Sequence, residues 1–145
     1  MDLIIKNNAP YQWKPLFSIM EARRDLEKIS KSFEYPFNDE EWDKYYTDLN
    51  LESFYIYQND QLIGHYSLRD LGGETWISHF LIKKEFRSQN IGSVVISMID
   101  RPKLRALVHP ENQAAIKFYM KNNFEFMGMI DRQIGMRKII QSNQT

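Results

Sequence analysis

Residues 82–92, which read I-K-K-E-F-R-S-Q-N-I-G, join an apolar run typical of a strand to a run that predicts a helix. The first N–H groups of a helix have no partner inside it and lie at the positive end of its dipole, so such a junction is a candidate anion site. Arg87 adds a guanidinium that suits phosphate. On local grounds alone the turn is more often a plain connection. It lacks the Lys-Ser/Thr ending of a P-loop and the three glycines of a dinucleotide-binding turn, which disfavours a nucleotide triphosphate.

Other side chains with chemical potential lie on predicted regular elements. Asn112 precedes a predicted helix over 112–122 and is expected to cap it, and Tyr119 on that helix has the spacing of a core aromatic. His79 lies in a predicted strand over 75–83, where a lone histidine is more often structural than catalytic. His65 and His109 have no ligand-like spacing with it, so we predict no metal site.

The elements that position these residues alternate between strands and helices. A helix is predicted from Pro15, with Leu16, Ile19, Met20, Leu26 and Ile29 along one face. Asn38, followed by three acidic residues, predicts a second capped helix through Asp48. Asn59-Asp60 predicts a hairpin turn and Gly72-Gly73 a second break. The remaining predictions are strands at 2–6, 53–58, 61–68, 75–83, 104–108, 124–130 and 136–140, and helices at 91–100 and 112–122. This order indicates a mixed α/β fold whose front half is antiparallel.

Length and composition limit the class of protein. The 145 residues fit one domain, which we place at 1–140, followed by a polar tail at 141–145. Nineteen basic and nineteen acidic side chains cancel, which argues against nucleic acid and anionic membrane as partners. Cysteine is absent, which excludes a cysteinyl acyl-enzyme and favours a reducing, cytoplasmic location. No signal peptide or membrane span is predicted.

Two segments resemble the signature motifs of the GNAT superfamily of acetyl-CoA-dependent N-acetyltransferases. They are F-R-S-Q-N-I-G-S from Phe86 and L-V-H-P-E-N-Q-A-A-I-K-F-Y-M-K-N-N-F from Leu107. The matching positions are Arg87, Gly92, Asn112, Ala115, Tyr119 and Phe124. Asn90 and Asn123 stand where the family has glycine. Asparagine tolerates a left-handed backbone, so both turns are expected to form, although the Asn90 side chain would crowd a phosphate.

The resemblance implies a mainly antiparallel sheet of six or seven strands, with a splayed central parallel pair and about four flanking helices. It also implies that acetyl-CoA is the co-substrate and that its arm lies in the splayed gap. The cofactor-binding residues implied are Phe80, Leu81, Ile82, Arg87, Ser88, Gln89, Asn90, Ile91, Gly92, Ser93, Asn112, Ala115, Phe118 and Tyr119.

The same resemblance assigns catalytic roles. The Tyr119 phenol would protonate the leaving thiolate, and a backbone N–H of residues 80–82 would polarise the thioester carbonyl. The resemblance does not place the base that deprotonates the amine. His79 is the candidate because it lies on the predicted strand 75–83 and imidazole titrates near neutral pH, with Glu74 and Glu85 as weaker candidates.

The acceptor amine is expected beside the first two helices, where acidic residues alternate with aromatic ones. Helix capping explains 39–41 more simply, which leaves Glu34, Tyr35 and Phe37 as substrate-binding candidates.

The sequence therefore predicts an N-acetyltransferase in which an amine attacks the thioester directly. The alternatives are a non-catalytic acyl-CoA-binding or regulatory module with the same fold, and an interaction domain without cofactor. The identity of the amine and the formation of a homodimer through the closing strands stay open.

Overall fold

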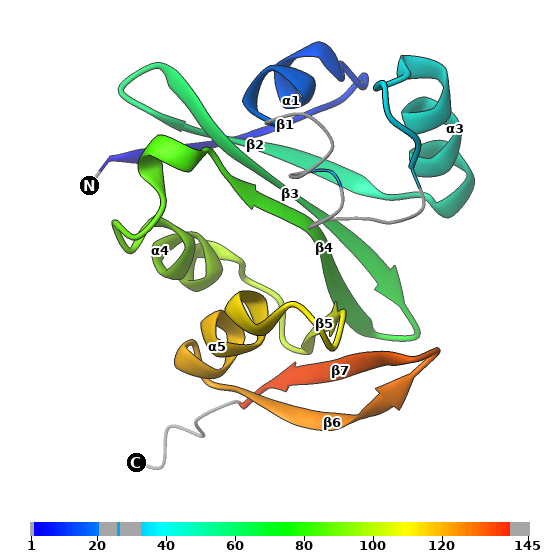
Figure 1. Cartoon of the computed structure of the whole chain (residues 1–145), viewed down its shortest axis with the longest axis vertical. Coiled ribbons are helices and arrows are strands. Elements are labelled where there is room, and N and C mark those ends of the chain that lie inside the picture. Colours follow the sequence, from blue (N-terminus) through cyan, green and yellow to red (C-terminus); the bar gives the residue numbers. More distant parts are fainter. Residues whose placement is uncertain (1, 21–25, 27–32, 140–145) are drawn as a thin grey trace.

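A computed structural model describes residues 2–20, 26 and 33–139. Within them, seven strands form one sheet in the order β1-β2-β3-β4-β5-β7-β6 (Figure 1). The elements are β1 (Leu3–Asn7), α1 (Lys14–Ile19), α3 (Asp39–Leu49), β2 (Glu52–Gln58), β3 (Gln61–Leu71), β4 (Glu74–Ile82), the 3₁₀ turn η1 (Lys84–Phe86), α4 (Ile91–Met98), β5 (Leu104–Val108), α5 (Gln113–Lys121), β6 (Phe124–Ile130) and β7 (Gln133–Lys138). The mixed α/β prediction is confirmed.

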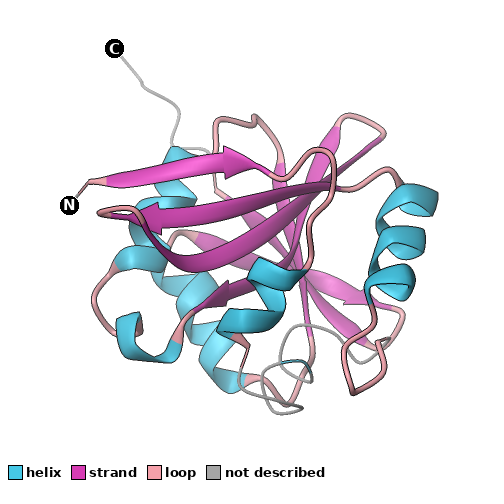
Figure 2. Cartoon of the chain, turned by 90° about the horizontal axis from the view of Figure 1, so that it is seen from above, coloured by secondary structure: helices cyan, strands magenta, loops and turns pink. Residues whose placement is uncertain are grey.

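The first four strands are antiparallel and follow one another along the chain. Asn59 and Asp60 both have positive φ, at 50° and 63°, which is the conformation of a two-residue turn that matches strand twist. Gly72 and Gly73 make the next turn with φ of 56° and 85°. Figure 2 shows the strands fanned by the twist of the sheet.

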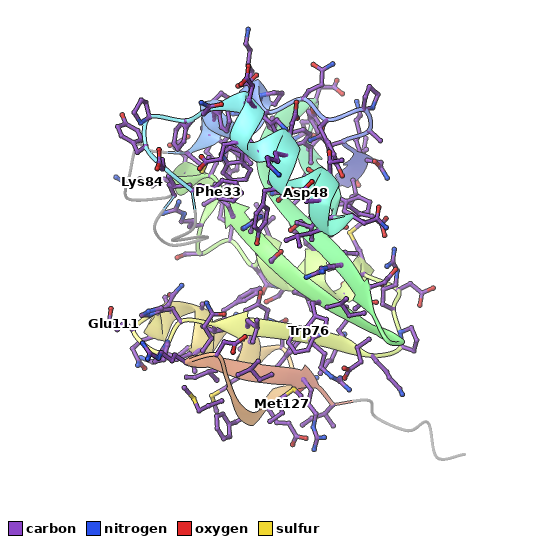
Figure 3. All side chains as sticks on the ribbon, turned by 90° about the vertical axis from the view of Figure 1, so that its right-hand side faces the viewer. Phe33, Asp48, Trp76, Lys84, Glu111 and Met127 are labelled. Carbon is purple, nitrogen blue, oxygen red and sulfur yellow. The ribbon has the colours of Figure 1, made fainter. Side chains whose placement is uncertain are left out.

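One parallel pair joins the two parts of the sheet, and it is short. β4 pairs with β5 only from Thr75 to Ile77, opposite residues 104–106. Beyond this seam the strands separate: in Figure 3 their ribbons run together near Trp76 and diverge towards Lys84 and Glu111. The predicted splay of the central parallel pair is therefore confirmed.

A bulge in β4 lies just after the seam. Between the pairs His65↔Leu81 and Ser67↔Ser78, β4 contributes one residue more than β3. His79 lies in this bulge with φ of +46°. In a regular strand, residues three positions apart face opposite sides of the sheet. The extra residue in the bulge reverses this alternation, so that Ile77 and Phe80 both join the same core.

Two cores cover the two faces of the sheet. On one face α4 and α5, the latter through Tyr119, pack against Ile56 and Ile77 of the sheet. On the other, α1 and α3 bring Trp13, Leu16, Trp42 and Tyr46 against Tyr55 and Leu81. Since Tyr55 and Ile56 are neighbours in β2, strand alternation sends them to opposite cores.

Several predicted boundaries differ from the structure. The first helix was expected to run past Met20 towards Ile29, but α1 ends at Ile19 and Met20 is extended, with ψ of 133°; Ile29 itself lies outside the described residues. α4 ends at Met98. β7 begins at Gln133, three residues early, because the left-handed Asp131 and Arg132 turn the chain at once. The predicted tail at 141–145 lies outside the described residues.

Candidate active site

A cavity of about 460 Å³ opens where β4 leaves β5. Its walls come from the end of β4, the turn after it, the first residues of α4 and one face of α5. Every residue predicted to bind the cofactor lines it except Gln89, whose side chain bonds the carbonyl of Glu85 instead. Phe86, Ala114 and Lys121 also line it and were not predicted. The sequence offered only their proximity to the motifs as a signal.

The start of α4 supplies hydrogen-bond donors to this cavity. Asn90 is the N-cap, with φ of 65°, so the left-handed turn expected for asparagine is confirmed. Its side chain makes no capping bond within the described structure. Val94 N–H donates to the Asn90 carbonyl, and the amides of residues 91–93 precede it in the first turn. These amides can bind an anion without any change in the helix.

Arg87 ties the turn to the strand before it. Its Nε donates to the Ile82 carbonyl at 2.7 Å, which holds the guanidinium beside the end of β4. Ser88, next along the cavity wall, is also left-handed, with φ of 64°. The turn therefore has a defined shape and brings a positive group to the cavity.

Gly92 packs directly under an aromatic ring of α5. A Cβ at this position would lie 2.8 Å from Cε1 and 3.0 Å from Cζ of Phe118, and 3.6 Å from Phe80. The absence of a side chain thus lets the two rings, whose centroids are 5.5 Å apart, close one wall of the cavity. Coenzyme A fits this donor set and space. Its pyrophosphate needs backbone amides and a cation, and its pantetheine arm needs an open channel.

Tyr119 is 6% exposed and lies on the cavity wall between Phe118 and Phe124, with centroid distances of 5.3 and 5.0 Å. Burial raises the pKa of its phenol, which therefore stays protonated at neutral pH. Asn112 accepts the Ala115 N–H at 3.1 Å, so its predicted role as helix cap is confirmed. It also lines the cavity.

His79 does not line the cavity. Its ring lies in the other core, where Nδ1 is 2.6 Å from the Tyr46 hydroxyl and the rings of Phe33, Trp42 and Tyr45 surround it. Burial, with a smaller contribution from the nearby His65, lowers the pKa of His79 to about 3. The imidazole is consequently neutral at pH 7.

The predicted acceptor residues lie beside this aromatic core. Phe37 stacks on Phe17 at 5.0 Å, and Tyr35 meets Phe37 edge to face at 5.3 Å. The backbone N–H of Glu34 donates to the Glu41 carboxylate at 3.2 Å. Asn38 accepts the Glu41 N–H, so the capping explanation for this acidic run is confirmed. None of the three predicted acceptor residues lines the described cavity.

Within the described ranges, no group of three or more His, Asp or Glu side chains could hold a metal ion. No helix in the same part of the chain is long and apolar enough to cross a membrane.

Sequence comparison identifies the class of protein that has this fold and cavity. The model of the acetyltransferase (GNAT) family matches residues 19–124. The chain belongs to the GNAT acetyltransferase family. No curated protein sequence matches it.

Solved structures share the fold at low sequence identity. The PaiA N-acetyltransferase of Thermoplasma acidophilum, in complex with coenzyme A, is 17% identical with a TM-score of 0.66, over 95% of this chain and 99% of that one. The spermidine N-acetyltransferase of Vibrio cholerae, in complex with CoA and spermine, is 16% identical with a TM-score of 0.67, over 93% and 92%. A domain from Methanocaldococcus jannaschii is 16% identical with a TM-score of 0.75, over 94% and 97%.

Proposed function

We propose that this chain transfers an acetyl group from acetyl-CoA to a primary amine, which attacks the thioester directly in a ternary complex. The observation that carries the proposal is a cavity that joins the donor-rich start of α4 to the buried phenol of Tyr119. The family assignment and the complexes of structural neighbours with CoA support it.

Each wall of the cavity has a role in this proposal. The amides of residues 91–93 and Arg87 hold the pyrophosphate, and the backbone of residues 80–82, which has left its parallel partner, binds the pantetheine arm. Bound acetyl-CoA supplies the activated acyl group. Tyr119 carries the proton that the leaving sulfur takes up, since burial keeps its hydroxyl protonated. Asn112 holds the arm from the α5 side.

His79 is the proposed base for the incoming amine. Burial keeps its imidazole neutral, but it also lowers the pKa to about 3, which makes the ring a weak base at neutral pH and opposes this role. The contact between Nδ1 and Tyr46 opposes this role, because it occupies one of the two ring nitrogens. The same contact favours the second candidate function, an acyl-CoA-binding module without catalysis. We propose Glu34, Tyr35 and Phe37 as the acceptor-binding residues and, by analogy with the spermidine enzyme, a small amine as acceptor.

A panel of primary amines assayed for free CoA separates the two functions. Acetyl transfer predicts release of CoA with at least one amine, whereas the binding module predicts thermal stabilisation by CoA with no thioester consumed. With the active amine, Tyr119→Phe should lower kcat by at least about tenfold while CoA affinity is retained. Tyr57→Phe is the matched control, because the Tyr57 ring on β2 lies under the ammonium group of Lys6 on β1 and does not line the cavity. Equal rates in Tyr119→Phe and the parent would remove Tyr119 from the chemistry.

A further inference from the structure

The bulge of β4 has to be held in place. His79 is left-handed, a conformation that disfavours residues with a side chain, and the bulge interrupts the regular pairing of β3 with β4. Its backbone carbonyl accepts a hydrogen bond from Nδ1 of His65 at 3.0 Å. His65 is fully buried in β3.

A buried hydrogen-bond chain fixes which nitrogen of His65 donates. The Asn8 Oδ1 accepts the Gln12 N–H at 2.8 Å, so the Asn8 amide group must donate to Ser53 Oγ, 3.0 Å away. The Ser53 hydroxyl hydrogen is then directed to His65 Nε2, at 2.7 Å. His65 therefore carries its own hydrogen on Nδ1 and donates it to the His79 carbonyl.

The four residues that link β1 to β4 in this chain are buried: Asn8 is 4% exposed, Ser53 1%, His65 0% and His79 5%. Every donor in it points the same way, from the end of β1 through β2 and β3 to β4. In a medium of low polarity such a fully satisfied network favours one geometry over alternatives. The last bond of the network is accepted by His79, two residues after Ile77, where the pairing of β4 with β5 ends. His79 also immediately precedes Phe80, the first residue of β4 to line the cavity.

We infer that His65 is a positioning residue for acyl transfer: by holding the His79 carbonyl it sets the direction in which β4 leaves β5 and so places the cavity wall at residues 80–82. This inference rests on the proposed function. His65 does not line the cavity and acts through the backbone of β4. It should affect the turnover step more than the binding of CoA, because the side chains of Asn8, Ser53, His65 and His79 do not line the cavity and the network reaches it only through the backbone of β4.

Two substitutions of His65 separate positioning from general support of the core. In His65→Asn the side-chain amide takes the place of Nδ1, so a donor to the His79 carbonyl is kept and the bond to Ser53 is lost. In His65→Gln the amide takes the place of Nε2, so the contact with Ser53 is kept and the donor to His79 is lost. Both replace one buried imidazole by an amide. A merely structural role therefore predicts similar losses of stability and rate in the two variants.

Positioning predicts a difference of about tenfold in kcat, with His65→Gln the slower, because only that variant loses the buried hydrogen bond to the His79 carbonyl, and it predicts similar CoA affinity in both. The Phe80 amide ¹⁵N shift, which reports polarisation of the peptide bond between His79 and Phe80, should stay near the parent value in His65→Asn and move in His65→Gln. Equal kcat values in two folded variants would overturn the inference, and so would a Phe80 shift that is the same in both.

Ser53→Ala decides the matter if neither His65 variant folds. It leaves the imidazole in place but removes the hydroxyl that directs the hydrogen to Nδ1, so the Nδ1–H tautomer should become less populated and kcat should fall. A shifted tautomer with unchanged kcat would overturn the inference. If the parent transfers no acetyl group to any amine, the proposed function fails, while the tautomer of His65 and the Phe80 shift still test whether His65 holds the bulge.

Discussion

Gly92 shows how a single missing side chain shapes the cavity. Gly92→Ala would place a Cβ within 3.0 Å of the Phe118 ring, and the ring would have to move into the cavity or away from Phe80. We expect about tenfold weaker CoA binding and a stability loss of about 1–3 kcal/mol, which is typical of overpacking. Calorimetric titration with CoA and urea unfolding would measure the two effects.

The double variant Gly92→Ala/Phe118→Leu is the control for this steric argument. Removing the ring should recover part of the lost stability, so the two changes should be strongly non-additive. Additive losses would show that the contact between the two positions is not the cause.

Residue types gave uneven information about backbone geometry. Asn90 and Asn123 replace glycine, and both are left-handed, with φ of 65° and 67°, as their side chains permit. His79 is left-handed too, and its sequence neighbours gave no sign of it. Its conformation comes from His65 and Tyr46, partners 14 and 33 positions away, so local patterns could not predict the bulge.

At the scale of elements, the start of α4 depends on one asparagine in a strained conformation. Asn90→Gly should tighten CoA binding, because it removes a side chain from the cavity wall while keeping the left-handed turn. Asn123→Gly is the matched control, since Asn123 has nearly the same φ but does not line the cavity. Both should change stability by less than about 1 kcal/mol.

CoA affinities of the two glycine variants, measured by titration, test this expectation. A gain in affinity confined to Asn90→Gly supports crowding by the Asn90 side chain. Unchanged affinity in that variant would show that the cavity accommodates asparagine as well as glycine.

The sequence predicted the types of the elements better than their limits. Residues 94–96 of α4 favour strands in isolation, and the helix forms there because Ile91, Val95 and Ile96 are buried on one face. The end of α1 could not be predicted, because neither Gly nor Pro follows Ile19 within the next ten residues. Most of the residues that line the cavity were predicted, because the two motifs and the splayed strand carry them. The acceptor side has no such motif, and only its aromatic character could be anticipated.

At the scale of the whole molecule, the two buried histidines make stability depend on pH. Burial lowers the pKa of His65 to about 4 and that of His79 to about 3, whereas an unfolded histidine has a pKa of about 6.5. Between these values the unfolded chain binds protons that the folded chain does not. Stability should therefore fall as pH decreases from about 6.5 towards 4, by on the order of 1 kcal/mol per pH unit for each histidine.

Urea unfolding at several pH values between 7 and 4.5 would measure this slope. His79→Phe removes one of the two groups and should give a shallower slope than the parent, although its stability at pH 7 is lower because Tyr46 loses its partner. Equal slopes in parent and variant would contradict the assignment of His79 as a buried neutral group.

The order of strands in the sheet has a consequence for the growing chain during translation. From β1 to β5 each strand lies beside the strand synthesised just before it, so every new strand meets a finished edge as it emerges. The rule breaks at the end, because β6 is made before β7 but lies outside it. β6 must therefore wait until β7 has left the ribosome and filled the place beside β5. Until then Phe126, Met127 and Met129, which stay exposed in the finished fold, belong to an unpaired strand, the part of the nascent protein most open to premature association.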